Sequence, residues 1–111
     1  MSKQLQEGGV YSVKEEDGTY GVIKILKMDN HGVHVRQYSN QFLEHPNSVD
    51  SAALYMAGIH RKPDEKLGLG HTPISNESFA GWQIRLIQVE QTTDEELEGY
   101  EYWKEEDGGY F

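Results

Sequence analysis

Residues Val10 to Lys27 read VYSVKEEDGTYGVIKILK, and this stretch decides the fold class. Asp17-Gly18 lies near its centre, and Asp-Gly between two apolar runs is among the strongest signals of a β-hairpin. We therefore expect a short strand over Val10 to Lys14 and a second strand over Tyr20 to Lys27. Apolar residues occur on both faces of the second strand, which is typical of a central strand.

Two further strands follow from the same kind of pattern. Residues 29–32 (DNHG) predict a second turn, after which Val33 and Val35 alternate with His34 and Arg36, as in a strand with one solvent-exposed face. Residues 82–89 (WQIRLIQV) predict a fourth strand. The sequence thus predicts a bent, mostly antiparallel sheet of four or five strands, either SH3-like or a partly open barrel.

The middle of the chain is less regular. After Pro46, the residues Val49, Ala52, Ala53 and Met56 fall at i, i+3, i+4 and i+7, which predicts a helix beginning after Ser48 and ending at Gly58. Residues 60–81 contain two prolines and three glycines and read as a long connection. Such connections are often functional or mobile.

A helix is predicted near the C-terminus. Thr93 with Glu96 three residues later forms a capping box, and Asp107-Gly108-Gly109 ends the helix. The fold class is therefore α+β, with this helix packed against the sheet. We expect residues 1–8 to be disordered and residues 9–111 to form a single domain.

Composition restricts the class of protein. The chain has 111 residues and no cysteine, which excludes disulfides and thiolate metal sites and suits a reducing compartment. No run approaches the roughly 20 apolar residues needed to cross a bilayer, and the first residues do not resemble a secretory signal. These features predict a cytoplasmic protein that does not enter a membrane.

The charge is concentrated at one end. The chain has a net charge of −9, and residues 94–111 hold eight of its nineteen acids with a single base, Lys104. The remaining bases are scattered, whereas nucleic-acid binding requires clustered Lys and Arg. We therefore expect no nucleic acid as a partner and a basic protein instead.

Catalytic and metal-ligating patterns are weak. His31 and His34 flank a turn, but zinc requires three or four ligands, so no metal or other cofactor is predicted. An active site would have to combine His71 with Ser75 or Ser78, and no nucleophile or phosphate-binding motif accompanies them. The prediction is that the protein is not an enzyme.

Two candidate binding surfaces remain. The first combines acids and rings of the C-terminal helix and the residues after it, because Tyr and Trp are enriched at interfaces; its residues are Glu98, Glu101, Tyr102, Trp103, Glu105 and Tyr110. The alternative is a ligand pocket of the 60–81 connection, bordered by His71, Pro73 and Trp82. Trp82 and Trp103 can equally belong to the core.

Residues 9–13 (GVYSV) and 18–26 (GTYGVIKIL), with the later strand after Gly81-Trp82, resemble the immunity protein 26 family of bacteria. The similarity to its opening hairpin covers about the first third of the chain. It implies an inhibitor that binds and blocks a cognate polymorphic toxin, without catalytic residues of its own. A homodimer also remains open, because a small sheet has unpaired edge strands.

Overall fold

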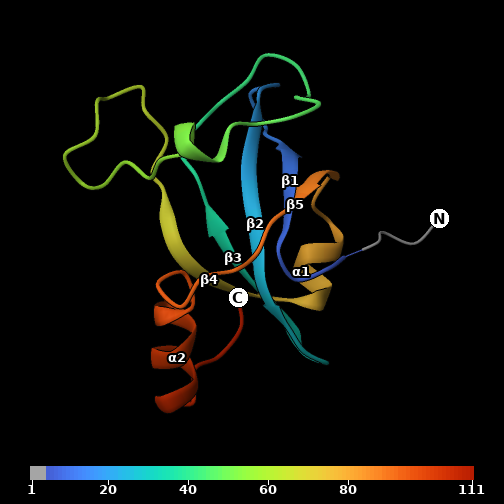
Figure 1. Cartoon of the computed structure of the whole chain (residues 1–111), viewed down its shortest axis with the longest axis vertical. Helices are drawn as coiled ribbons and strands as arrows, with labels where there is room; N and C mark the ends of the chain where they lie inside the picture. The colour runs from blue at the N-terminus through green and yellow to red at the C-terminus, as the bar shows by residue number, and fades with distance from the viewer. Residues whose placement is uncertain (1–4) are drawn as a thin grey trace.

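The computed structural model describes residues 5–111. They contain one open five-stranded antiparallel sheet with the strand order β4-β3-β2-β1-β5 (Figure 1). Its strands are β1 (Gly9–Lys14), β2 (Tyr20–Met28), β3 (Gly32–Gln37), β4 (Leu69–Ser75) and β5 (Ile84–Val89). Two α-helices, α1 (Asn76–Ala80) and α2 (Glu98–Glu105), and a 3₁₀ turn, η1 (Ser51–Ala53), complete it. The predicted small α+β fold with a C-terminal helix is confirmed.

The predicted hairpin and the central position of β2 are confirmed. β1 pairs with β2 in the register Val10↔Lys24 to Lys14↔Tyr20. Gly18 lies in the turn at φ 88°, a backbone conformation that glycine adopts without steric cost. Residues 21–26 of β2 are all buried, because both faces of this strand are covered.

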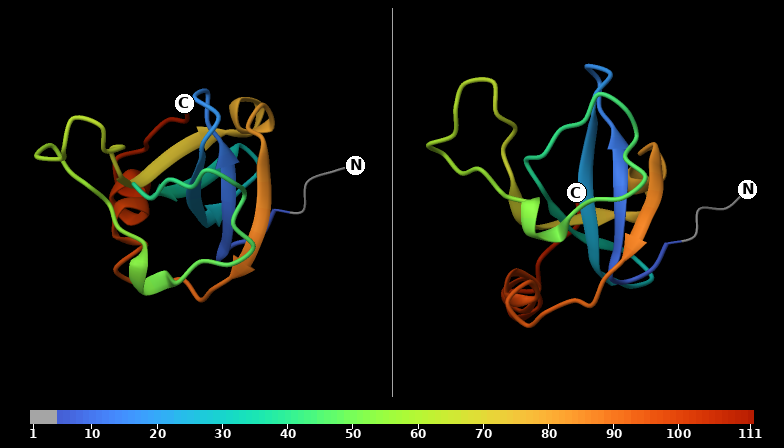
Figure 2. Two further views of the ribbon diagram at one scale, coloured as in Figure 1. Left: turned by 90° about the horizontal axis from the view of Figure 1, so that it is seen from above. Right: turned by 45° about the horizontal axis from the view of Figure 1, so that its top comes forward.

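Apolar residues form a cluster on each face of the sheet. The larger cluster consists of Tyr11, Val13, Ile23, Ile25, Val33, Val35, Ile74 and Phe79. The smaller cluster consists of Val10, Val22 and Tyr38, with Phe42, Val49, Leu54 and Ile87 packed against it. The segment between β3 and η1 crosses this second face (Figure 2), so the irregular middle of the chain completes the core.

The helix predicted between Ser48 and Gly58 is wrong. Only η1 is helical there, and Asp50 rather than Ser48 caps it, accepting a hydrogen bond from the Ala52 amide at 3.0 Å. The backbone instead bonds across the loop, since the Tyr55 carbonyl accepts from the Ser39 amide at 2.8 Å. An extended segment also places Val49 and Leu54 against the smaller cluster, which outweighs the local helical spacing.

The connection predicted over residues 60–81 is also wrong, because it contains β4 and α1. β4 pairs with β3 in the register Val33↔Ile74 and His34↔Pro73, and this pairing buries Ile74. Pro73 is compatible with a strand here because β4 lies at the edge of the sheet.

Both ends of the described chain are held against the sheet. Residues 1–4 of the predicted disordered segment lie outside the described residues, whereas the Gly8 amide donates to the Ile25 carbonyl at 2.7 Å. At the other end, the Phe111 amide donates to the Pro73 carbonyl at 3.0 Å and the Ser75 amide donates to the Phe111 carbonyl at 2.9 Å. The last residue therefore pairs with part of the β4 edge.

The capping box before α2 is confirmed. The Thr93 amide donates to Glu96 at 2.9 Å, and the Glu96 amide donates back to the Thr93 hydroxyl at 3.2 Å. The α-helix itself begins at Glu98, after a turn over residues 94–97. Between residues 5 and 111 there is no helix of the length and apolar character that a membrane span requires.

Candidate functional site

The outer face of α2 carries an exposed stripe of acids around one ring. Glu98, Glu101, Tyr102 and Glu105 are all exposed, and 66% of Tyr102 is accessible to solvent. Their spacing of i, i+3, i+4 and i+7 places them on one side of the helix. We call these four residues the α2 stripe.

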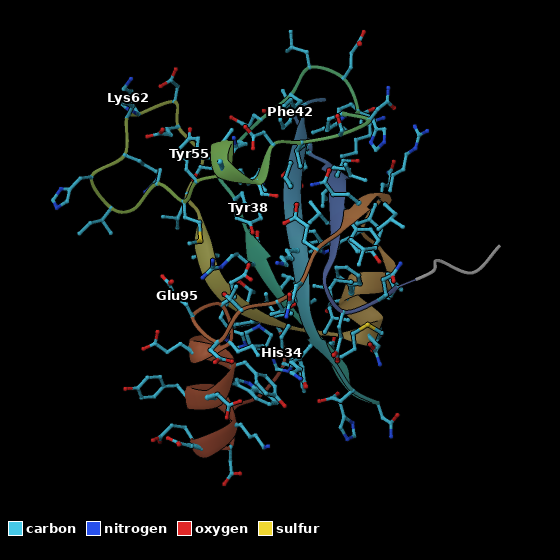
Figure 3. All side chains as sticks on the ribbon, viewed as in Figure 1. His34, Tyr38, Phe42, Tyr55, Lys62 and Glu95 are labelled. Carbon is cyan, nitrogen blue, oxygen red and sulfur yellow. The ribbon has the colours of Figure 1, made fainter. Side chains whose placement is uncertain are left out.

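The opposite face of α2 packs against His34 of β3. The ring of Trp103 lies 4.4 Å from the His34 ring and that of Tyr100 lies 4.8 Å from it, both edge to face. Figure 3 shows His34 beside the rings that α2 directs toward the sheet. Trp103 is thus separated from the exposed residues with which it was predicted to bind a partner, and it fixes the helix instead.

A chain of hydrogen bonds runs beneath α2. The Tyr110 hydroxyl donates to the Asp29 carboxylate and lies 2.8 Å from Nε2 of His34. Nδ1 of His34 in turn lies 2.8 Å from Nε2 of His71, on the neighbouring strand β4. When Asp29 is ionised, each of these three hydrogen bonds has one donor and one acceptor if His34 and His71 are both neutral and carry their protons on Nε2.

The environment of these hydrogen bonds favours the neutral forms of His34 and His71. Burial, and to a lesser degree the positive charge of His71, lowers the pKa of His34 to about 4, although Asp29 acts in the opposite direction. Burial also lowers the pKa of His71. Burial and the bond to Asp29 raise the pKa of the Tyr110 hydroxyl. Near pH 7 these hydrogen bonds therefore connect the turn between β2 and β3, the strands β3 and β4, and the C-terminal residues.

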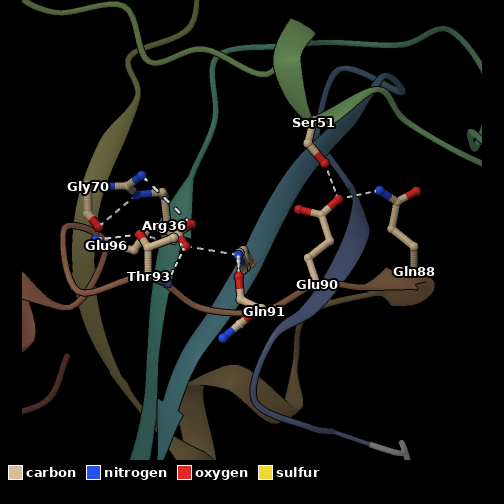
Figure 4. Close-up of polar contacts among 9 residues, drawn as sticks. Arg36, Ser51, Gly70, Gln88, Glu90, Gln91, Thr93 and Glu96 are labelled. Carbon is tan, nitrogen blue, oxygen red and sulfur yellow. Dashed lines mark hydrogen bonds and ion pairs between the residues drawn. The ribbon is translucent and has the colours of Figure 1, made fainter.

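The turn before α2 is fixed by a second polar contact. Glu96 forms ion pairs with Lys24 at 3.0 Å and with Arg36 at 3.8 Å (Figure 4), and the Lys24 side chain is only 3% exposed. Burial alone would raise the pKa of Glu96, but the hydrogen bonds from Thr93 and Lys24 and the two positive charges lower it. Within residues 5–111, no other acid among residues 94–111 forms an ion pair.

The predicted partner-binding residues are therefore divided between two faces of α2. The α2 stripe is exposed as expected, whereas Trp103 and Tyr110 are partly buried and point toward His34. The Trp103 indole also donates to the Gly109 carbonyl at 3.0 Å, which folds the last residues back under the helix.

The structure does not bring together His71, Pro73 and Trp82, the residues predicted to border the alternative pocket. His71 borders a depression beside α2, Pro73 is buried, and Trp82 packs on Phe79 at 5.2 Å next to a different pocket. The prediction is wrong because its premise of one irregular loop is wrong.

The structure does not bring His71 together with Ser75, the combination that an active site would have required. His71 and Ser75 are four positions apart on β4, about 13 Å at the usual rise of a strand. Ser75 instead caps α1, where its hydroxyl accepts from the Ser78 amide at 3.1 Å.

Burial of His34 was missed because its alternation with Val33 and Val35 was interpreted as a solvent-exposed face. The side chain has no exposed surface, because α2 and the C-terminal residues cover this face of β3. His31 remains exposed on the turn. Among residues 5–111, no group of three or more His, Asp or Glu side chains is placed to hold a metal ion.

No family model, curated protein or solved structure matches this chain.

Proposed function

We propose that this domain binds a basic protein through the α2 stripe, most concretely as an immunity-type inhibitor of a basic toxin. The observation that carries the proposal is the contrast between the two faces of α2. The inner face is fixed to the sheet by Trp103 and His34, and the outer face presents three acids around Tyr102. A charged, exposed surface on a fixed element is suited to binding a macromolecule.

The charge of the stripe supports a basic partner. Glu96 is neutralised by Lys24 and Arg36, but Glu98, Glu101 and Glu105 form no ion pair within residues 5–111. Their negative field is therefore directed outward, where it accelerates the encounter with a positively charged surface. A toxin that acts on nucleic acid is such a protein, since it needs Lys and Arg to hold phosphates.

The fixed geometry supports affinity. An interface that is already ordered loses less conformational entropy on binding. Tyr102 supplies a large side chain with only two rotatable torsions in the middle of the acids, and Tyr is enriched among the residues that dominate binding energy. The resemblance of residues 9–13 and 18–26 to the opening hairpin of the immunity protein 26 family is the reason to specify a toxin.

Site-specific photo-crosslinking tests the proposal. A benzophenone amino acid is placed at Tyr102 in one variant and at Ile59 in a control variant, and both proteins are produced in their native cells. Ile59 is 85% exposed and belongs to the segment between η1 and β4. Crosslinked proteins are then identified by mass spectrometry.

We expect Tyr102 to crosslink one basic protein, which Ile59 does not crosslink, with a yield that falls as salt is added. If that protein is a toxin, co-expression must also suppress its toxicity. No Tyr102-specific product, or a product that is acidic and insensitive to salt, would overturn the proposal.

A further inference from the structure

A second surface of this acidic protein is locally basic. A pocket of about 430 Å³ lies where β1, β5 and the segment after β3 meet, and none of residues 94–111 lines it. The side chains that matter for its chemistry are Ser12, Lys14, Tyr20, His45, Trp82 and Arg85. The volume falls within the range of small-molecule sites, about 300–1,000 Å³.

Strand register brings four of these residues together. Ser12 pairs with Arg85 on β5, and Lys14 pairs with Tyr20 on β2. Directly opposed residues of antiparallel strands share a face of the sheet, as do residues two apart on one strand. Lys14 and Arg85 are then diagonal neighbours, which usually lie about 7–8 Å apart, so both long side chains can reach one anion.

The charges of the residues that line the pocket favour an anionic ligand. The pocket lining contains Lys14 and Arg85 but no Asp or Glu. Neither base forms an ion pair with any of residues 5–111, whereas Lys24 and Lys66 both do. Glu15 and Glu16 line an adjoining pocket that shares Lys14 and Trp82 with this one, and there Glu15 pairs with Lys66. Glu44, which precedes His45, is exposed and is not part of the lining.

The pocket also contains a polar side chain whose orientation is fixed by a hydrogen bond. Ser12 is 2% exposed, and its hydroxyl is hydrogen-bonded to Nδ1 of His45. Burial and the nearby charge of Arg85 lower the pKa of His45, so its ring is neutral near pH 7. When the Ser12 hydroxyl donates to Nδ1, Nε2 carries the proton and can donate to a ligand oxygen.

Aromatic rings form the apolar part of the site. Trp82 is held by Phe79 of the core, with ring centroids 5.2 Å apart. Tyr20 lies edge to face with His45, with ring centroids 6.2 Å apart. Anchored rings beside two cations are suited to a ligand that combines a planar group with negative charge.

We propose that this pocket binds a small organic anion with a planar ring. A carboxylate or phosphate lies between Lys14 and Arg85 and accepts a hydrogen bond from His45, and the ring packs on Trp82. Aromatic carboxylates and mononucleotides share this chemistry. The site is independent of the α2 stripe.

NMR titration with four probes tests the site: indole-3-acetate, AMP, uncharged indole and inorganic phosphate. The indole N–H of Trp82 is the reporter, and Trp103, the only other tryptophan, is an internal control. We expect a saturable shift of Trp82 but not of Trp103 with indole-3-acetate or AMP, at least fivefold tighter than with indole or phosphate. The tighter of the two ring-bearing anions identifies the class of ligand.

Variants decide whether the pocket is responsible. Arg85→Gln and Lys14→Gln should each weaken binding at least fivefold, and the matched charge change Lys62→Gln should leave it unchanged, because exposed Lys62 lies outside this pocket. The proposal is overturned if neither ring-bearing anion gives a saturable Trp82 shift, or if Lys62→Gln weakens binding as much as Arg85→Gln does.

Discussion

Acidification is expected to loosen the contact between α2 and the sheet, because His34 is buried as a neutral ring. In the unfolded chain the pKa of His34 has its ordinary value of 6.5, and in the folded protein it is lowered to about 4. The neutral ring therefore contributes stability that is fully present above pH 6.5 and is lost as the pH falls toward 4. Linkage between these two pKa values gives a loss of about 2 kcal/mol from pH 7 to pH 5 for this residue alone. The lowered pKa of His71 acts in the same direction.

Two measurements check this expectation. Titration of the imidazole carbon-bound protons by NMR gives the pKa of His34 directly, and urea denaturation at pH 7 and pH 5 gives the change in unfolding free energy. His34→Phe keeps a ring in the cluster but cannot titrate, so its loss of stability between the two pH values should be about 2 kcal/mol smaller than in the wild type. A His34 pKa near 6.5, or an equal loss in the folded variant, would refute the reasoning.

The packing of α2 gives two more predictions, both measured by urea denaturation. Trp103→Ala should lower the free energy of unfolding by about 2 kcal/mol, which is less than for a fully buried Trp because this side chain is partly exposed. Tyr102→Ala, at an exposed position, should change it by no more than about 0.5 kcal/mol. Equal effects of the two variants would show that the inner face does not fix the helix. Gly99→Ala should destabilise the protein although alanine is the better helix former by about 1 kcal/mol, since the new Cβ would lie 2.6 Å from Cβ of His71. A stabilised Gly99→Ala would mean that α2 does not approach β4 this closely.

Local signals predicted the elements whose stability is largely local. Asp17-Gly18 indicated the first hairpin, and Thr93 with Glu96 indicated the turn into α2, because each signal involves residues that contact one another within a few positions. β4 was missed because Pro73 and its glycine neighbours argue against a strand, and its pairing with β3 depends on residues about forty positions away.

The candidate site was predictable only in part. The helical spacing of the acids placed them on the solvent side of α2, and the structure exposes them. The sequence did not indicate which rings point inward, because that depends on where α2 lies against β3. The alternation around His34 indicated a strand correctly but carried no information about the helix, some 65 residues later, that covers its outer face.

The affinity of two charge-reversed proteins for the partner crosslinked at Tyr102 tests the central claim most directly. One variant changes Glu98, Glu101 and Glu105 to Lys, and the matched control changes the exposed acids Glu16, Glu44 and Asp64 to Lys, so that both have the same net charge. If the α2 stripe is the binding surface, the first variant binds about 100-fold more weakly than the control near 0.1 M salt, as expected for three reversed contacts of up to about 1 kcal/mol each. Equal affinity of the two variants would contradict the claim.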